Sequence, residues 1–154
     1  MEHVLLFFHL VGAFALVAGA AVAGTLQVAA LRRERPSEVA VLLRATRPGV
    51  VLVALGALLT LGFGVALASQ LGYGLSPAWI QASLGLWAAA VVLGAAGGRT
   101  ARHARYLAEQ LAASGDAPSA ELRALVAHRP SLILSWVSSI LIVAIVVLMV
   151  WRPT

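Results

Sequence analysis

The chain has 154 residues, of which 61% are hydrophobic and 11% are charged, and its formal net charge is +5. Soluble domains carry about 25% charged residues, so this composition excludes an ordinary soluble domain and indicates a membrane protein. Cysteine is absent, which excludes disulfides, thiolate metal sites and cysteine nucleophiles.

Four apolar segments are long enough to cross a bilayer, which takes roughly 20 residues. They are residues 4–31, 49–69, 79–97 and 132–151. We therefore predict an all-α, polytopic membrane protein, with four transmembrane helices in an antiparallel bundle that forms a single domain, 1–154. The first segment lacks a basic start and is too long for a signal peptide, so we expect it to remain as an uncleaved anchor.

The arginines are distributed unevenly. Five lie between the first and second segments, five lie between the third and fourth, and none lies between the second and third. This arrangement follows the positive-inside rule, and the absence of lysine indicates a GC-rich bacterial gene. We predict a bacterial cytoplasmic (inner) membrane protein with both arginine-rich loops inside and both termini outside. The positive charge then reflects topology and not nucleic-acid binding.

The second and fourth segments begin alike, with "ATRPGVVLV" from Ala45 and "AHRPSLILS" from Ala127. Proline is well placed in a first helical turn, so each Arg-Pro pair predicts a helix start. Because each half consists of a helix, a basic loop and a returning helix, we expect a parallel two-plus-two repeat. In the first basic loop, Ser37 is expected to cap a brief helix at the interface. In the second, the third helix runs on and is followed by a turn at "SGDAP" and a short helix.

Small residues recur every four positions in the first three segments and let helices pack closely. The fourth segment carries serines, whose hydroxyls bond across the bundle or back to their own helix. We interpret all four stripes as packing surfaces. Their members are Ala20 and Gly24; Gly56, Thr60 and Gly64; Ala90, Gly94 and Gly98; and Ser131, Ser135 and Ser139.

His9 is the single ionisable residue in the apolar stretch "FFHLVGAFALVAGAAVAG". An ionisable side chain inside a membrane is a functional-site hypothesis. Counting about 1.5 Å per residue from Arg32 places His9 at the outer edge of the hydrocarbon. It heads a helical face of small residues that begins at Gly12, and a flat ligand or another helix fits such a groove.

Haem b is one candidate ligand. His103 and His128 lie in the basic loops at the opposite side of the membrane and no carboxylate lies in any span, which argues against bis-histidine haem within one chain and against a zinc or di-iron site. The fourth span should place Met149 at the same depth in the membrane as His9, and a His/Met pair is a known haem ligation. The candidate cofactor site is therefore His9 as metal ligand, with Gly12 and Met149. The alternative is an interfacial histidine that hydrogen-bonds locally and a methionine that packs.

Three stretches resemble a known family. They are "FFHLVGAFALVAGA", "RPGVVLVALGALLTLGFGVAL" and "IVVLMVWRPT", and over nearly the whole chain they resemble the bacterial "predicted integral membrane protein" family, domain of unknown function 2269. More distantly, the first-helix histidine is similar to that of the HemJ-type protoporphyrinogen oxidases and the CopD-type copper-resistance membrane proteins. The HemJ likeness implies that His9 is an axial haem ligand. Those oxidases carry an important lysine after the first helix, and this sequence has none, so the likeness does not extend to the oxidase activity.

Three functions remain. The first, which the family likeness favours, is a haem b- or porphyrin-binding membrane protein for electron transfer or haem handling. It predicts that His9 faces the bundle interior beside a cavity. The second is a non-catalytic accessory subunit, with an uncovered small-residue face. The third is a small transporter with a polar path. The expected partners are the lipid bilayer and copies of the chain or a larger membrane complex, and not nucleic acid.

Overall fold

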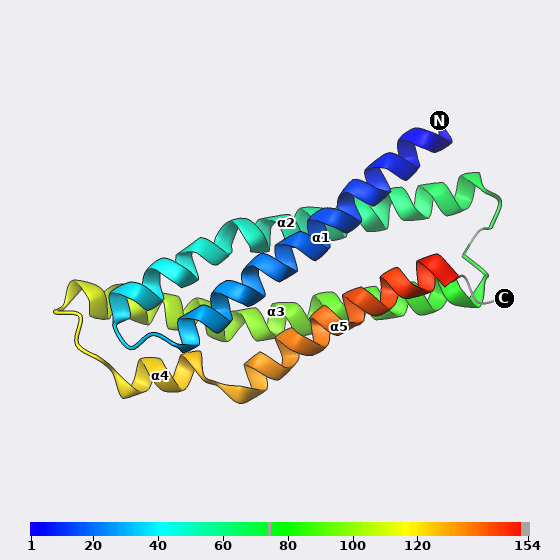
Figure 1. Cartoon of the computed structure of the whole chain (residues 1–154). Coiled ribbons are helices and arrows are strands. Elements are labelled where there is room, and N and C mark those ends of the chain that lie inside the picture. The colour runs from blue at the N-terminus through cyan, green and yellow to red at the C-terminus, as the bar shows by residue number, and fades with distance from the viewer. Residues whose placement is uncertain (74, 152–154) are drawn as a thin grey trace.

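The computed structural model describes residues 1–73 and 75–151, so that Gly74 of the connection between the second and third segments and the final Arg152, Pro153 and Thr154 lie outside the described residues. The described part is all-α (Figure 1). The segments α1, α2, α3 and the stretch of α4 with α5 are long and apolar enough to cross a membrane. This confirms the prediction of an all-α membrane protein. The helices are α1 (Glu2–Leu31), α2 (Pro36–Gln70), α3 (Ala78–Ala113), α4 (Ala120–Val126) and α5 (Arg129–Trp151).

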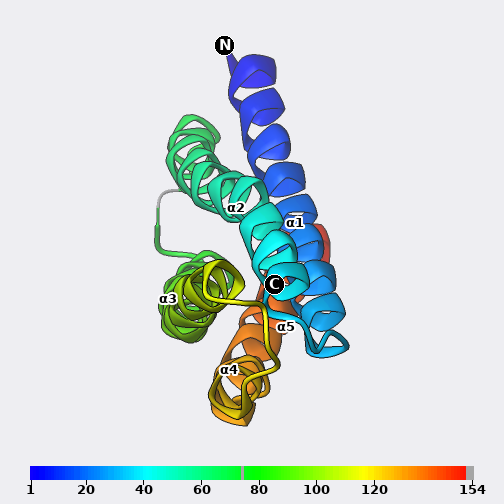
Figure 2. The same cartoon turned by 90° about the vertical axis from the view of Figure 1, so that its left-hand side faces the viewer.

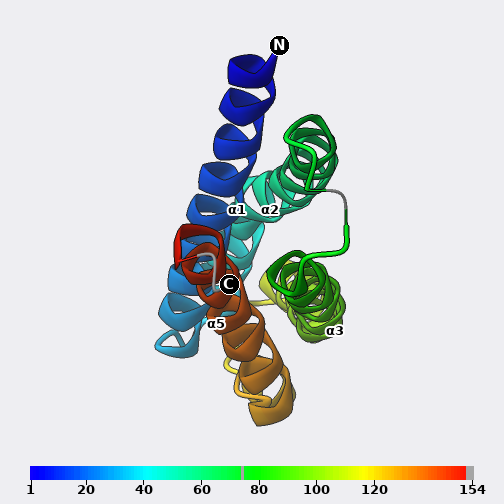
Figure 3. The same cartoon turned by 90° about the vertical axis from the view of Figure 1, so that its right-hand side faces the viewer.

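The long helices form two hairpins, α1 with α2 and α3 with α5. Consecutive long helices run in opposite directions, and the first turn of α1 and the last turn of α5 lie at the same end of the bundle (Figure 1). Figures 2 and 3 show that the two hairpins cross at an angle, with the first turns of α1 directed away from α5. Contact between the hairpins is made mainly by α2 and α3. The two-plus-two duplication itself stays a prediction.

Two buried clusters hold the bundle together. The middle cluster takes one residue from each long helix, namely Leu16, Ala57, Ala90 and Ile142. The second lies at the arginine-rich end and contains Ala30, Val39, Ala40, Leu43, Ala104, Ala108 and Leu122. Many other large apolar side chains are exposed, as expected where helices meet lipid, which is as apolar as leucine.

One predicted helix boundary is wrong. α2 begins at Pro36 and continues through Pro48, so the brief interfacial helix and the span expected from residue 49 are one helix of 35 residues. A proline inside a helix loses the hydrogen bond to the carbonyl four residues earlier, here that of Arg44. The helix continues because its first turns are anchored in the arginine-end cluster, where Val39 is 2% exposed.

The start of α2 also differs from the prediction, because Ser37 does not cap a separate helix. Its backbone N–H and its hydroxyl both donate to the carboxylate of Asp116, each at 2.7 Å. Asp116 lies in the expected turn after α3, with a left-handed φ of 57°. A carboxylate stabilises a helix N-terminus, so this contact ties the second basic loop to the first. The hydrogen bonds from Ser37 lower the pKa of Asp116 below its ordinary value.

Candidate functional site

The groove of small residues predicted below His9 is filled by α2. Gly12 and Gly19 on α1 and Gly56 on α2 have no room for a side chain, because an added Cβ would come within 2.7 Å of a backbone atom of the facing helix. This is the close approach that small residues permit between membrane helices. Of the two occupants that the sequence allowed for this groove, the helix is the one present.

His9 closes the α1–α2 seam at the end of the bundle that holds the first turn of α1 (Figure 1). Its Nδ1 lies 2.9 Å from the backbone carbonyl oxygen of Thr60. Its ring lies over Gly64, where an added Cβ would come within 2.9 Å of the imidazole. A carbonyl oxygen only accepts hydrogen bonds, so Nδ1 carries a proton and donates it to Thr60, and Nε2 is the ring nitrogen left for another partner.

The other ring nitrogen of His9 is free. Among the residues that the structure describes, Nε2 has no hydrogen-bond partner, and the side chain is partly exposed. The preceding residue, Phe8, stacks on Phe63 of α2 with ring centroids 5.0 Å apart, and Phe7 meets Phe8 edge to face at 5.4 Å. His9 therefore faces the filled α1–α2 seam, with its ring over Gly64 and next to the stacked Phe8 and Phe63.

The fold brings Gly12 to His9 but does not bring Met149 there. Met149 lies in the last turns of α5, which packs mainly on α3, and these turns lie apart from the first turns of α1 in Figures 1 and 3. Within residues 1–73 and 75–151, no group of three or more His, Asp or Glu side chains could hold a metal ion. The candidate site is thus one histidine with a fixed Nδ1 and a free Nε2.

The second hairpin is joined by hydroxyl groups. Ser131 and Ser138 donate to backbone carbonyls of α3 at 2.6 and 2.7 Å, whereas Ser135 and Ser139 bond back to their own helix. The predicted serine stripe therefore contains one of the two crossing bonds and misses Ser138. The sequence could have indicated that Ser138 also faces α3, because Ser138 follows Ser131 by seven residues, which is close to two helical turns.

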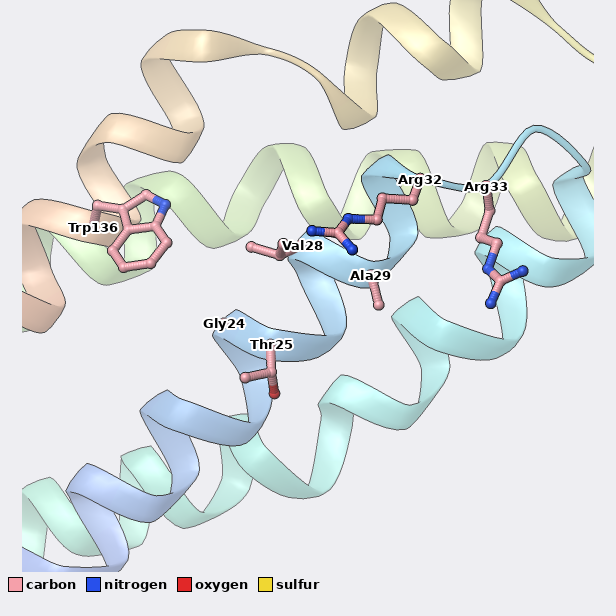
Figure 4. A pocket seen from close by; sticks show the side chains of 7 residues that line it. All are labelled: Gly24, Thr25, Val28, Ala29, Arg32, Arg33 and Trp136. Carbon is pink, nitrogen blue, oxygen red and sulfur yellow. The ribbon is translucent and has the colours of Figure 1, made fainter.

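A hollow of about 610 Å³ lies at the arginine-rich end, between the last turns of α1 and the first turns of α5 (Figure 4). Arg32 has no side-chain partner within the described part of the chain, whereas Arg33 lies 3.6 Å from Glu38. Sequence reasoning assigned both arginines to topology alone and missed the hollow, because its two walls are far apart in the sequence. The lining residues are Gly24, Thr25, Val28, Ala29, Arg32, Arg33 and Trp136.

The chain belongs to the family described as predicted integral membrane protein, domain of unknown function 2269, whose model matches residues 3–153. The family resemblance expected from the sequence is thereby confirmed over nearly the whole chain. No curated protein and no solved structure matches the chain.

Proposed function

We propose that this family member binds haem b, or a related porphyrin, through His9, and that it serves in electron transfer or haem handling without being an enzyme itself. One observation carries the proposal: while His9 Nδ1 is held 2.9 Å from the Thr60 carbonyl, Nε2 has no partner among the described residues. Histidines that ligate metals generally donate their other ring N–H to such an acceptor, which fixes the tautomer and leaves Nε2 for the metal.

The surroundings of His9 suit an apolar ligand. The seam beneath the ring is filled by α2, so a porphyrin would have to reach His9 from its partly exposed side. The neighbouring Phe8, stacked on Phe63, gives that part of the seam an aromatic edge. When bound, haem supplies one-electron redox chemistry. This chain would hold the iron through Nε2 of His9 and would supply an apolar environment, and Met149 is not part of the proposed site because the fold does not bring it near His9.

The filled seam favours a second candidate function. If His9 and Gly12 only hold α1 against α2, the chain is a non-catalytic accessory subunit of a larger membrane complex or of a homo-oligomer. A transporter has less support, because the four predicted spans contain no Asp, Glu, Lys or Arg and charged side chains usually mark ion and proton paths.

We also propose a bacterial cytoplasmic membrane, with both termini outside. The support is the position of the arginines in the fold. Ten of the eleven lie between the first and second predicted spans or between the third and fourth, at the end of the bundle opposite the first turn of α1 (Figure 1). The positive-inside rule places such an end in the cytoplasm.

The test of haem binding is an absorption spectrum of the detergent-purified protein, expressed with ample haem and measured oxidised and then dithionite-reduced. We expect a Soret band with α and β bands on reduction, lost in His9→Ala. His3→Ala is the matched control, because it removes an exposed histidine from the same helix, and it should keep the spectrum. A featureless wild-type spectrum, or a Soret band retained in His9→Ala, would overturn the proposal and leave the accessory-subunit reading.

A further inference from the structure

We infer that the hollow between α1 and α5 binds an anionic phospholipid, with the Arg32 guanidinium on the phosphate and the acyl chains along the apolar wall. This site lies at the opposite end of α1 from His9 and does not depend on haem binding. In Figure 4 the Arg32 side chain lies along Val28, on the side of α1 that faces Trp136. Arg33 lies in the connection after α1, and its side chain extends toward α2 (Figure 4).

Charge complementarity selects an anionic occupant. Arg33 is partly neutralised by Glu38 at 3.6 Å, whereas the Arg32 side chain has no acidic or hydrogen-bonding partner among the described residues. Its guanidinium stands where the apolar stretch of α1 ends and the charged loop begins, which is the level of the lipid headgroups. Guanidinium groups bind phosphate oxygens in a bidentate manner.

The shape and lining of the hollow select an amphiphile over a free anion. Its volume of about 610 Å³ falls in the range of ligand pockets, roughly 300–1,000 Å³. Apart from the arginines, the walls are mainly apolar: the Thr25 hydroxyl already donates to its own helix, at 2.9 and 3.0 Å, and Trp136 is 60% exposed. A Cβ added to Gly24 would meet no atom within 4 Å, so this wall is open to an acyl chain. Basic pockets between membrane helices recognise phospholipid headgroups in this way.

Native mass spectrometry of the detergent-purified full chain tests the inference. The protein is titrated with phosphatidylglycerol or with phosphatidylcholine of the same acyl chains. We expect stronger binding of phosphatidylglycerol, and about a fivefold loss in Arg32→Gln, as roughly 1 kcal/mol per basic residue at a membrane surface gives. Arg102→Gln is the matched control, because Arg102 is an exposed, unpaired arginine on α3 that does not line the hollow, and it should leave binding unchanged.

A second variant, Gly24→Leu, tests the apolar wall. The added side chain enters open space, so the thermal stability of the protein in detergent should be retained while phosphatidylglycerol binding falls. Equal losses of phosphatidylglycerol binding in Arg32→Gln and Arg102→Gln would overturn the site. Binding of phosphatidylcholine as strong as that of phosphatidylglycerol would overturn it too. Displacement of the lipid by inorganic phosphate at matched concentration would overturn the choice of a phospholipid over a free anion.

Discussion

Replacing Gly56 by alanine is expected to force α1 and α2 apart. A Cβ on Gly56 would lie 2.5 Å from the backbone nitrogen of Leu16 and 2.7 Å from the carbonyl oxygen of Gly12. Real Cβ atoms essentially never approach other atoms within 3.0 Å. Both neighbours are backbone atoms, which no change of side-chain rotamer moves, so the whole seam has to open to accept the methyl group.

The expected cost follows from that geometry. Overpacking of a close-packed site costs about 1–3 kcal/mol, and the upper part of this range applies because separating the helices also weakens neighbouring contacts. We expect a loss of about 2–3 kcal/mol in the free energy of unfolding. For a chain of 154 residues, this lowers Tm by roughly 4–12 °C.

The assay is thermal unfolding in detergent, followed by circular dichroism. Gly62→Ala is the matched control, because it makes the same change in the same helix at a position where a Cβ would meet no atom within 4 Å. Alanine is the better helix former by about 0.8–1.0 kcal/mol, so Gly62→Ala should leave Tm unchanged or raise it. Similar losses in both variants, or none in Gly56→Ala, would refute the reasoning.

Two further predictions concern polar contacts. Ser138→Ala removes the 2.7 Å hydrogen bond to the Ala90 carbonyl and should cost about 0.6–1.7 kcal/mol in thermal unfolding, whereas Ser139→Ala, whose hydroxyl bonds its own helix, should cost little. Equal effects would contradict this assignment. The folded pKa of Asp116 lies below its ordinary 3.8, so its contact with Ser37 contributes stability that is full above that pH and lost as the pH falls through the folded pKa. Asp116→Asn should therefore lower Tm at neutral pH and have less effect below pH 3.8; a Tm difference that does not vary with pH would speak against it.

The helices and hairpins were predictable because few backbone structures are stable in the hydrocarbon of a membrane. Backbone polar groups in hydrocarbon must be satisfied within the segment, so apolar runs of this length become helices. The connections between the spans keep neighbouring helices antiparallel. The glycine stripe of α2 was also predicted as a packing surface, and Gly56 and Gly64 both face α1.

The wrong predictions concern positions where residues distant in the sequence determine the local structure. Pro48 resembles a helix start in sequence, but burial of Val39 against residues of other helices keeps α2 continuous through it. The cap of α2 comes from Asp116, which lies 79 residues from Ser37. Neither contact leaves a periodic or compositional trace in its own segment, so no local pattern could predict it.

His9 shows why the small residues of a helix groove do not reveal whether a ligand or another helix occupies it. The hydrogen bond from Nδ1 to the Thr60 carbonyl fits a packing residue and a metal ligand equally well, and the two roles differ only at Nε2. Asparagine places an amide N–H near the position of Nδ1 and has no counterpart of Nε2. His9→Asn should therefore keep most of the thermal stability that His9→Ala loses, about 1 kcal/mol for one hydrogen bond. If His9 is a haem ligand, His9→Asn nevertheless loses the Soret band. Retention of both stability and spectrum would remove His9 from the site, whereas a stable protein without the band would separate ligation from packing at this one residue.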